Sequence, residues 1–283
     1  MVEFLSGVNR LTTAAYKETN NPFSKQQQKT IVSLKKKSKL APIYPLDKTK
    51  RLIAQNNDDY EQMLRNCLNK DNPTVRTNLP STTQSNFNLK LRKISEKYKN
   101  QSIYTKINNC KSSEPLPSYP YALVKDHKEG ELKGRPIIST VSSVVRPLSK
   151  FIAKILNPMV KEHVESYLQS SQEFISSLQS VNTQTIIFLG SFDVKNLYGS
   201  IPLLNFNAYP GLLEVVTKFY DQFKSSSRYP ELATNDFHDL LELCLFSDTY
   251  LLNGVSRKQS KGIAMGNCAA LPLSILYMNI IED

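Results

Sequence analysis

The chain has 283 residues, of which 40% are hydrophobic, so it can form a real core as one large domain or two ordinary ones. No apolar run approaches the roughly 20 residues of a membrane-spanning helix, and residues 1–21 lack the features of a signal peptide. The four cysteines lie far apart without a C-x-x-C pair, which disfavours a zinc site or disulfide framework and favours reduced, packed thiols. We therefore expect a soluble, intracellular protein with no membrane contact.

Positive charge is concentrated in the first part of the chain. Residues 1–160 carry 28 Lys and Arg against 12 Asp and Glu, a net charge of +16, whereas residues 161–283 carry 8 against 13, a net charge of −5. A single basic run is often only a solvated face. An excess that extends over 160 residues favours a polyanionic partner, and nucleic acid is the usual one.

The first part of the chain predicts short elements around a basic helix. Residues 1–32 indicate a leader of uncertain order. Residues 40–70 predict a strand, a turn at "LDKTK", a second strand "RLIAQ" and an amphipathic helix that begins at Asn57 or Asp58. Residues 71–119 are rich in Asn, Ser, Thr and Pro around one helix at about 87–99, and "SSEPLPSYP" marks a break.

The second part predicts strands and helices in alternation. Residues 121–140 predict two strands around a charged loop, and a helix with apolar positions every three to four residues follows over 144–168. We then expect a strand at 185–194, helices at about 211–224 and 235–246, a short strand at 249–254, and a glycine turn before a final apolar helix. Pro272 is expected to kink that helix.

One carboxylate needs an explanation. In "IIFLGSFDVKNLYGSIP" (186–202), Asp193 ends an apolar run, and burial of an unpaired carboxylate would cost several kcal/mol. Asp193 therefore either faces water at a strand end or belongs to a charged site.

Four segments, in order, resemble motifs of reverse transcriptases. "FLGSFDVKNLYGSIP" is similar to the first catalytic palm motif, and "QSKGIAMGNCAALPLSILYM" to the palm motif Q-x-x-G-[IV]-x-M-G that follows it. "YALVKDHKEGELKGRPIIS" resembles a fingers segment, and "PLDKTKRLIAQNNDDYEQML" the Asp-Lys segment before that. The combination of H-K before R-P-I with N-C-A after M-G most resembles the reverse transcriptases of Penelope-like retroelements, over roughly residues 33–282.

The resemblance implies two-metal nucleotidyl transfer. Such chemistry uses two divalent cations, Mg²⁺ or Mn²⁺, held by carboxylate and carbonyl oxygens. Asp193 and the Val194 carbonyl would contribute ligands. Tyr198 would lie beneath the sugar and reject a ribose 2′-hydroxyl, unless it is simply a core residue. Arg135, fixed by Pro136, would contact the incoming triphosphate, with Lys48, Lys50 and Arg51 as further candidates.

The remaining candidates concern the base pair and the nucleic-acid backbone. Gly262 and Gly266 would permit close approach of the chain to a base pair, unless they are ordinary turn glycines, and Gln259 and Met265 would line that base pair. Lys125, His127 and Lys128 would touch template or primer, or else form a plain solvated loop.

The implied fold is α+β, with right-hand polymerase-like fingers and an incomplete palm that ends before the catalytic Asp-Asp hairpin. The expected domains are a leader (1–32), a basic fingers-like region with a connecting helix (33–184) and a partial palm (185–283). Because Asp193 would lack its carboxylate partners, we expect binding without polymerisation from this chain.

Two functions from different classes remain open. The first is the RNA-directed DNA polymerase domain of a retroelement, with an RNA template, a DNA primer and deoxynucleoside triphosphates as partners and a nuclear location. The second is a non-catalytic nucleic-acid-binding module that keeps the polymerase scaffold. A telomerase-type or group II intron enzyme is a weaker alternative.

Overall fold

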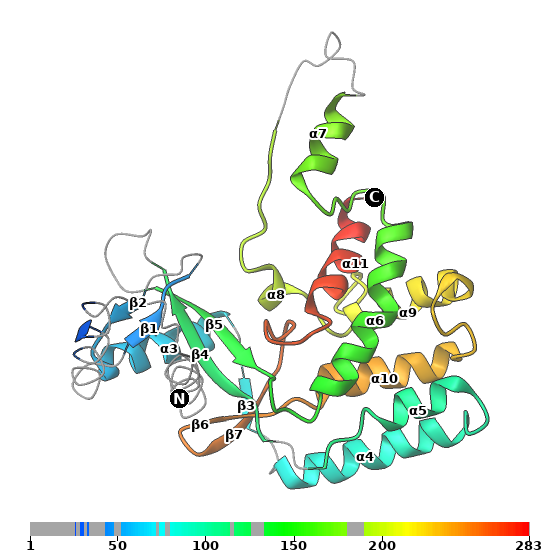
Figure 1. Ribbon diagram of the computed structural model, residues 1–283, viewed down its shortest axis with the longest axis horizontal. Coiled ribbons are helices and arrows are strands. Elements are labelled where there is room, and N and C mark those ends of the chain that lie inside the picture. Colours follow the sequence, from blue (N-terminus) through cyan, green and yellow to red (C-terminus); the bar gives the residue numbers. More distant parts are fainter. Residues whose placement is uncertain are drawn as a thin grey trace. The chain divides into compact units, whose positions relative to one another are not determined.

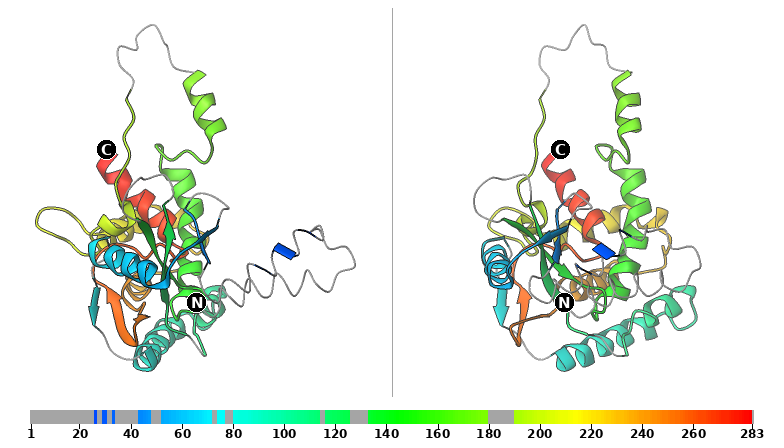
Figure 2. Two further views of the ribbon diagram at one scale, coloured as in Figure 1. Left: turned by 90° about the vertical axis from the view of Figure 1, so that its left-hand side faces the viewer. Right: turned by 60° about the vertical axis from the view of Figure 1, so that its left-hand side comes forward.

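The computed structural model describes residues 26, 29–30, 33, 43–47, 52–71, 74–76, 80–113, 116–125, 133–179 and 190–282. The chain divides into two compact units, residues 1–62 and 63–283. Figure 1 and Figure 2 show the elements of each unit. Among the described residues, no helix has the length and apolar character needed to cross a membrane.

The first unit contains a small antiparallel hairpin and the start of a helix. Strand β1 (Ile43–Pro45) pairs with β2 (Leu52–Ala54), and α3 (Asn57–Asp71) follows. The ring of Tyr44 stacks on that of Tyr60 with centroids 3.5 Å apart, and the Tyr44 hydroxyl donates to Asn57 Oδ1. The two predicted strands and the helix are therefore confirmed, including the helix start at Asn57, whereas residues 48–50 of the predicted turn lie outside the described residues.

The second unit combines two small antiparallel sheets with a helical core. Strands β4 (Tyr119–Val124) and β5 (Gly134–Ser139) form a hairpin, as predicted for residues 121–140. Strand β7 (Val255–Gln259) lies between β3 (Thr74–Arg76) and β6 (Tyr250–Leu252). The β6–β7 turn uses Asn253 and Gly254, both with positive φ, as a two-residue hairpin favours. The protein is thus mixed helix and sheet, of the α+β class.

The helices of this unit are α4 (Pro80–Glu96), α5 (Ser102–Asn108), α6 (Arg146–His163), α7 (Ser171–Gln179), α8 (Leu197–Ser200), α9 (Leu212–Phe223), a 3-10 turn η2 (Lys224–Ser226), α10 (Thr234–Phe246) and α11 (Ala270–Glu282). Helices α9 and α10 match their predictions, and α6 lies within the predicted 144–168. Helix α4 begins seven residues before the predicted basic helix.

Helix α6 is the centre of the core. Its residues Leu148, Ile152, Ile155 and Met159 recur at helical spacing and are fully buried. Helices α5, α10 and α11 contact it, and α11 runs beside it in both views of Figure 2. The hydrophobic core is continuous from α4 to α11, so it extends across the expected boundary at 184/185.

A buried carboxylate connects the turn after α4 to α10. Asp236 accepts hydrogen bonds from Lys97 Nζ (2.5 Å) and the Tyr98 hydroxyl (2.6 Å), and the backbone N–H of Ala233 donates to that hydroxyl. Because Asp236 is only 5% exposed, its charge is stabilised by these donors rather than by water.

Two predictions differ from the structure. Residues 190–194 are irregular and exposed, whereas a strand was expected over 185–194; residues 185–189 lie outside the described residues. No described strand pairs with residues 190–194, and a strand needs a hydrogen-bonded neighbour. Pro272 does not interrupt α11, because it occupies the first turn, where the missing N–H has no helical acceptor.

Candidate functional site

The loop that follows β7 is built around Gly262. This residue has φ +74°, and a Cβ at its position would lie 2.4 Å from the Tyr198 carbonyl oxygen and 2.6 Å from Gly199 Cα. The next residue, Ile263, donates its backbone N–H to the same Tyr198 oxygen at 2.7 Å. Only glycine allows this contact, which fixes the loop against α8.

A second glycine fixes the same loop against β5. A Cβ at Gly266 would lie 2.1 Å from the carbonyl oxygen of Ile138, and the Thr140 hydroxyl donates to the Gly266 carbonyl at 2.5 Å. The loop 260–266 therefore joins α8, just after Asp193, to the β5 strand that carries Arg135. Three of the four motif segments meet here, although they lie far apart in the sequence.

The β4–β5 hairpin presents Arg135 on its less buried face. Arg135 is half-buried and opposite Leu123, whereas the neighbouring Gly134 and Pro136 belong to the buried face. A Cβ at Gly134 would lie 3.3 Å from the Sγ atom of Cys67 of α3. The Cys67 thiol also donates a hydrogen bond to the Gly134 carbonyl oxygen. Close packing of α3 thus fixes the strand from which Arg135 projects.

Tyr198 is half-buried and packs against the hydrophobic core. Its ring therefore has both an internal and an accessible part, which fits the predicted sugar contact and the core alternative. Asn196, the residue before α8, has φ +55°, a conformation that asparagine tolerates. This left-handed residue turns the chain from the exposed segment of Asp193 into α8.

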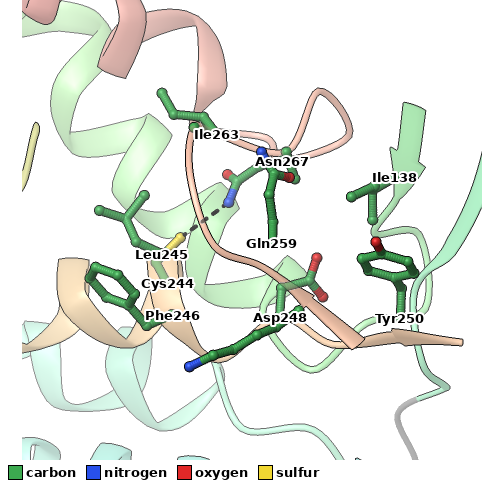
Figure 3. A pocket seen from close by; sticks show the side chains of 12 residues that line it. Ile138, Cys244, Leu245, Phe246, Asp248, Tyr250, Gln259, Ile263 and Asn267 are labelled. Carbon is green, nitrogen blue, oxygen red and sulfur yellow. Dashed lines mark hydrogen bonds between the residues drawn. The ribbon is translucent and has the colours of Figure 1, made fainter. Parts of the chain in front are cut away.

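A small pocket lies behind the loop 260–266. The side chains of Asp248, Gln259 and Asn267 reach into it, and Figure 3 shows them with the surrounding apolar residues. The pocket has about 20 Å³ of space, enough for a water molecule but not for a nucleotide. Gln259 donates to the Lys261 carbonyl at 2.6 Å, and Asn267 donates to Cys244 Sγ at 3.6 Å. These contacts stabilise the loop from beneath.

Asp248 connects three segments of the chain, and the sequence did not predict this role. Its Oδ1 accepts hydrogen bonds from the hydroxyls of Ser118 (2.7 Å) and Ser143 (2.6 Å). Burial raises the pKa of the carboxyl to about 6, although the bonds from Ser143, Ser118 and the Thr249 backbone act in the opposite direction. Nothing in "CLFSDTYLL" signals a buried acid, because the two serines come from distant segments.

Asp193 and Val194 lie on the exposed irregular segment, and Val194 is 45% exposed. Within the described part of the chain, no three His, Cys, Asp or Glu side chains are grouped so that they could hold a metal ion. Among the described residues, Asp193 therefore belongs to no group of three or more potential metal ligands.

The other predicted residues are placed as follows. Gln259 and Gly262 line the small pocket, Met265 is half-buried in the loop, and Lys125 follows β4 with its N–H bonded to the Lys133 carbonyl. Lys48, Lys50, Arg51, His127 and Lys128 lie outside the described residues.

Comparisons with protein-family models, with curated proteins and with solved structures find no match to this chain.

Proposed function

We propose that the chain is a nucleic-acid-binding polymerase scaffold of the reverse transcriptase type, from a Penelope-like retroelement. The observation that supports this most strongly is the loop 260–266. Its two glycines allow the backbone to contact α8, which carries Tyr198, and β5, which carries Arg135. In a polymerase, these are the segments that must surround the sugar, the base pair and the triphosphate.

The proposed roles follow from the chemistry of each side chain. Arg135 would offer charge-assisted hydrogen bonds to phosphate oxygens, and its strand is fixed by α3. The accessible part of the Tyr198 ring would contact the sugar. The basic excess of residues 1–160, +16 by sequence, would attract the template and primer backbones.

The described residues do not fit a two-metal centre. Asp193 is exposed, and no cluster of three potential ligands exists among the described residues. Two divalent ions need several carboxylate oxygens on a rigid frame. We therefore expect the 283-residue chain to bind nucleic acid without extending a primer.

The isolated Asp193 also favours the second candidate, a non-catalytic nucleic-acid-binding module. Both candidates predict that this chain binds nucleic acid without extending a primer. Extension of a DNA primer on an RNA template with Mg²⁺ or Mn²⁺ and deoxynucleoside triphosphates would exclude the non-catalytic module.

The test combines a salt series with primer extension. Binding of an RNA–DNA primer–template should weaken at least roughly tenfold between about 50 and 200 mM salt, because lysines and arginines displace counterions. Extension should be absent with either metal. Extension that disappears in Asp193→Asn would show that the chain is itself a polymerase, and weak binding without salt dependence would refute the proposal as a whole.

A further inference from the structure

An open groove lies between α6 and α11, away from the loop 260–266. It has a volume of about 460 Å³, and its apolar walls include Val160 of α6, Tyr167, and Leu271 and Ile275 of α11. Its polar lining consists of Asn157, Lys161 and Gln169. Among the described residues that line it, none carries a carboxylate. We call this feature the α6–α11 groove.

Lysines follow the exposed face of α6 toward this groove. Lys150, Lys154 and Lys161 are exposed, while the opposite face of the helix is buried in the core. At 1.5 Å per residue, the first two lie about 6 Å apart along the helix axis and the last two about 10 Å. The ion pairs found among the described residues include none of these three lysines. Their charges therefore face water.

The groove also offers a surface for bases. Tyr167 is half-buried at the groove wall, and Leu271 is 53% exposed. An aromatic ring beside apolar walls can stack a base, and side-chain amides can bond base edges. The volume exceeds what one planar base needs. A basic stripe next to an aromatic, open groove is the combination by which proteins bind single strands.

We propose that the α6–α11 groove binds single-stranded nucleic acid, with bases against Tyr167 and phosphates along Lys150, Lys154 and Lys161. The inference rests on the proposed nucleic-acid function but concerns a second surface, since none of Arg135, Tyr198, Gly262 or Gly266 lines the groove. A purely apolar partner would leave the lysines unmatched, whereas a phosphate backbone matches them.

The test compares two charge-reversal variants of the whole chain. The K154E/K161E variant reverses two of the three lysines that we call the lysine stripe (Lys150, Lys154 and Lys161). The K99E/R228E variant reverses two exposed cations outside the groove, with the same change in net charge. Binding of oligothymidylate and oligouridylate is measured in a salt series. We expect at least a roughly tenfold loss of affinity in the groove variant, at most a few-fold loss in the control, and a salt slope smaller by about 1.4 for two lost contacts.

A stacking readout completes the test. Replacement of Tyr167 by Leu should weaken binding several-fold and abolish the fluorescence quenching of a 2-aminopurine in the oligonucleotide. Equal losses in both charge variants, or quenching that survives Tyr167→Leu, would overturn the groove as the binding surface. If the chain self-associates, and Leu271→Ser abolishes this self-association without changing the oligonucleotide affinity, the groove binds a second copy of the chain and the proposal is overturned.

The outcomes separate this inference from the proposed function. If K154E/K161E changes neither the salt-dependent binding of the RNA–DNA primer–template nor the oligonucleotide affinity, only the inference about the α6–α11 groove is refuted. Loss of all salt-dependent binding in the unaltered chain would refute both.

Discussion

At the scale of single residues, two glycines with similar backbone angles play different roles. Gly262 has φ +74° and no room for a Cβ beside the Tyr198 carbonyl, whereas Gly254 has φ +76° and open space around it. A positive φ disfavours any residue with a side chain at both positions. Only at Gly262 would a Cβ also collide with backbone atoms.

Gly262→Ala should therefore be far more destabilising than Gly254→Ala. We expect the turn variant to lose about 1 kcal/mol of unfolding free energy from backbone strain, and the loop variant at least about 2 kcal/mol more, because the loop or α8 must move. Urea unfolding measures both. Equal losses would mean that the loop is not held against α8 as described.

The residues of the candidate site were only partly predictable. The sequence motif indicated Gly262 and Gly266, and the structure gives each a steric reason. No sequence motif indicated Asp248, because the hydrogen-bond partners of Asp248, Ser118 and Ser143, lie more than 100 positions away in the chain. Long-range side-chain contacts of this kind have no local pattern.

At the scale of elements, Asp248 connects β6 to the segments that flank the β4–β5 hairpin. Ser118 precedes β4 and Ser143 follows β5, and backbone bonds from Ser118 to Thr249 and from Leu251 to Ser118 support the same junction. The hairpin that carries Arg135 is thus anchored at its base through one carboxyl group.

This anchor predicts a pH dependence of stability. The pKa of Asp248 is raised to about 6 in the folded chain from an ordinary 3.8, so folding favours the protonated form. Its stabilising contribution is complete below about pH 4 and is lost as the pH rises through 6. The control is Asp248→Asn, because its amide stays neutral and its oxygen can accept both serine hydrogen bonds. Relative to this variant, the unaltered chain should lose about 2 kcal/mol of unfolding free energy between pH 4 and 7. Parallel stability curves for the two proteins would contradict the buried, raised-pKa carboxyl.

Element prediction succeeded where the pattern was local. The spacing of apolar residues predicted α6, and the sequence also predicted α9, α10 and the two strands β4 and β5 around a charged loop. It failed at residues 190–194, because an apolar run becomes a strand only if a neighbour completes its hydrogen bonds. It also missed β3 and β7, whose pairing joins residues about 180 positions apart.

At the scale of the whole molecule, we propose two separate surfaces for a polyanion. The first is the loop 260–266 with its neighbouring strand and helix, and the second is the α6–α11 groove. The motif segments converge at the first, which we assign to the primer end and nucleotide. The lysine stripe marks the second, which we assign to single-stranded nucleic acid.

The most direct measurement is a photo-crosslink from the primer end. A DNA primer with 4-thiothymidine at its 3′ terminus is annealed to an RNA template, bound to the chain at low salt and irradiated, and the crosslinked peptides are identified by mass spectrometry. We predict crosslinks within residues 196–201 or 259–266, where α8 meets the glycine loop. Salt-sensitive crosslinks that fall only elsewhere in the chain would contradict the assignment of this junction as the primer and nucleotide site.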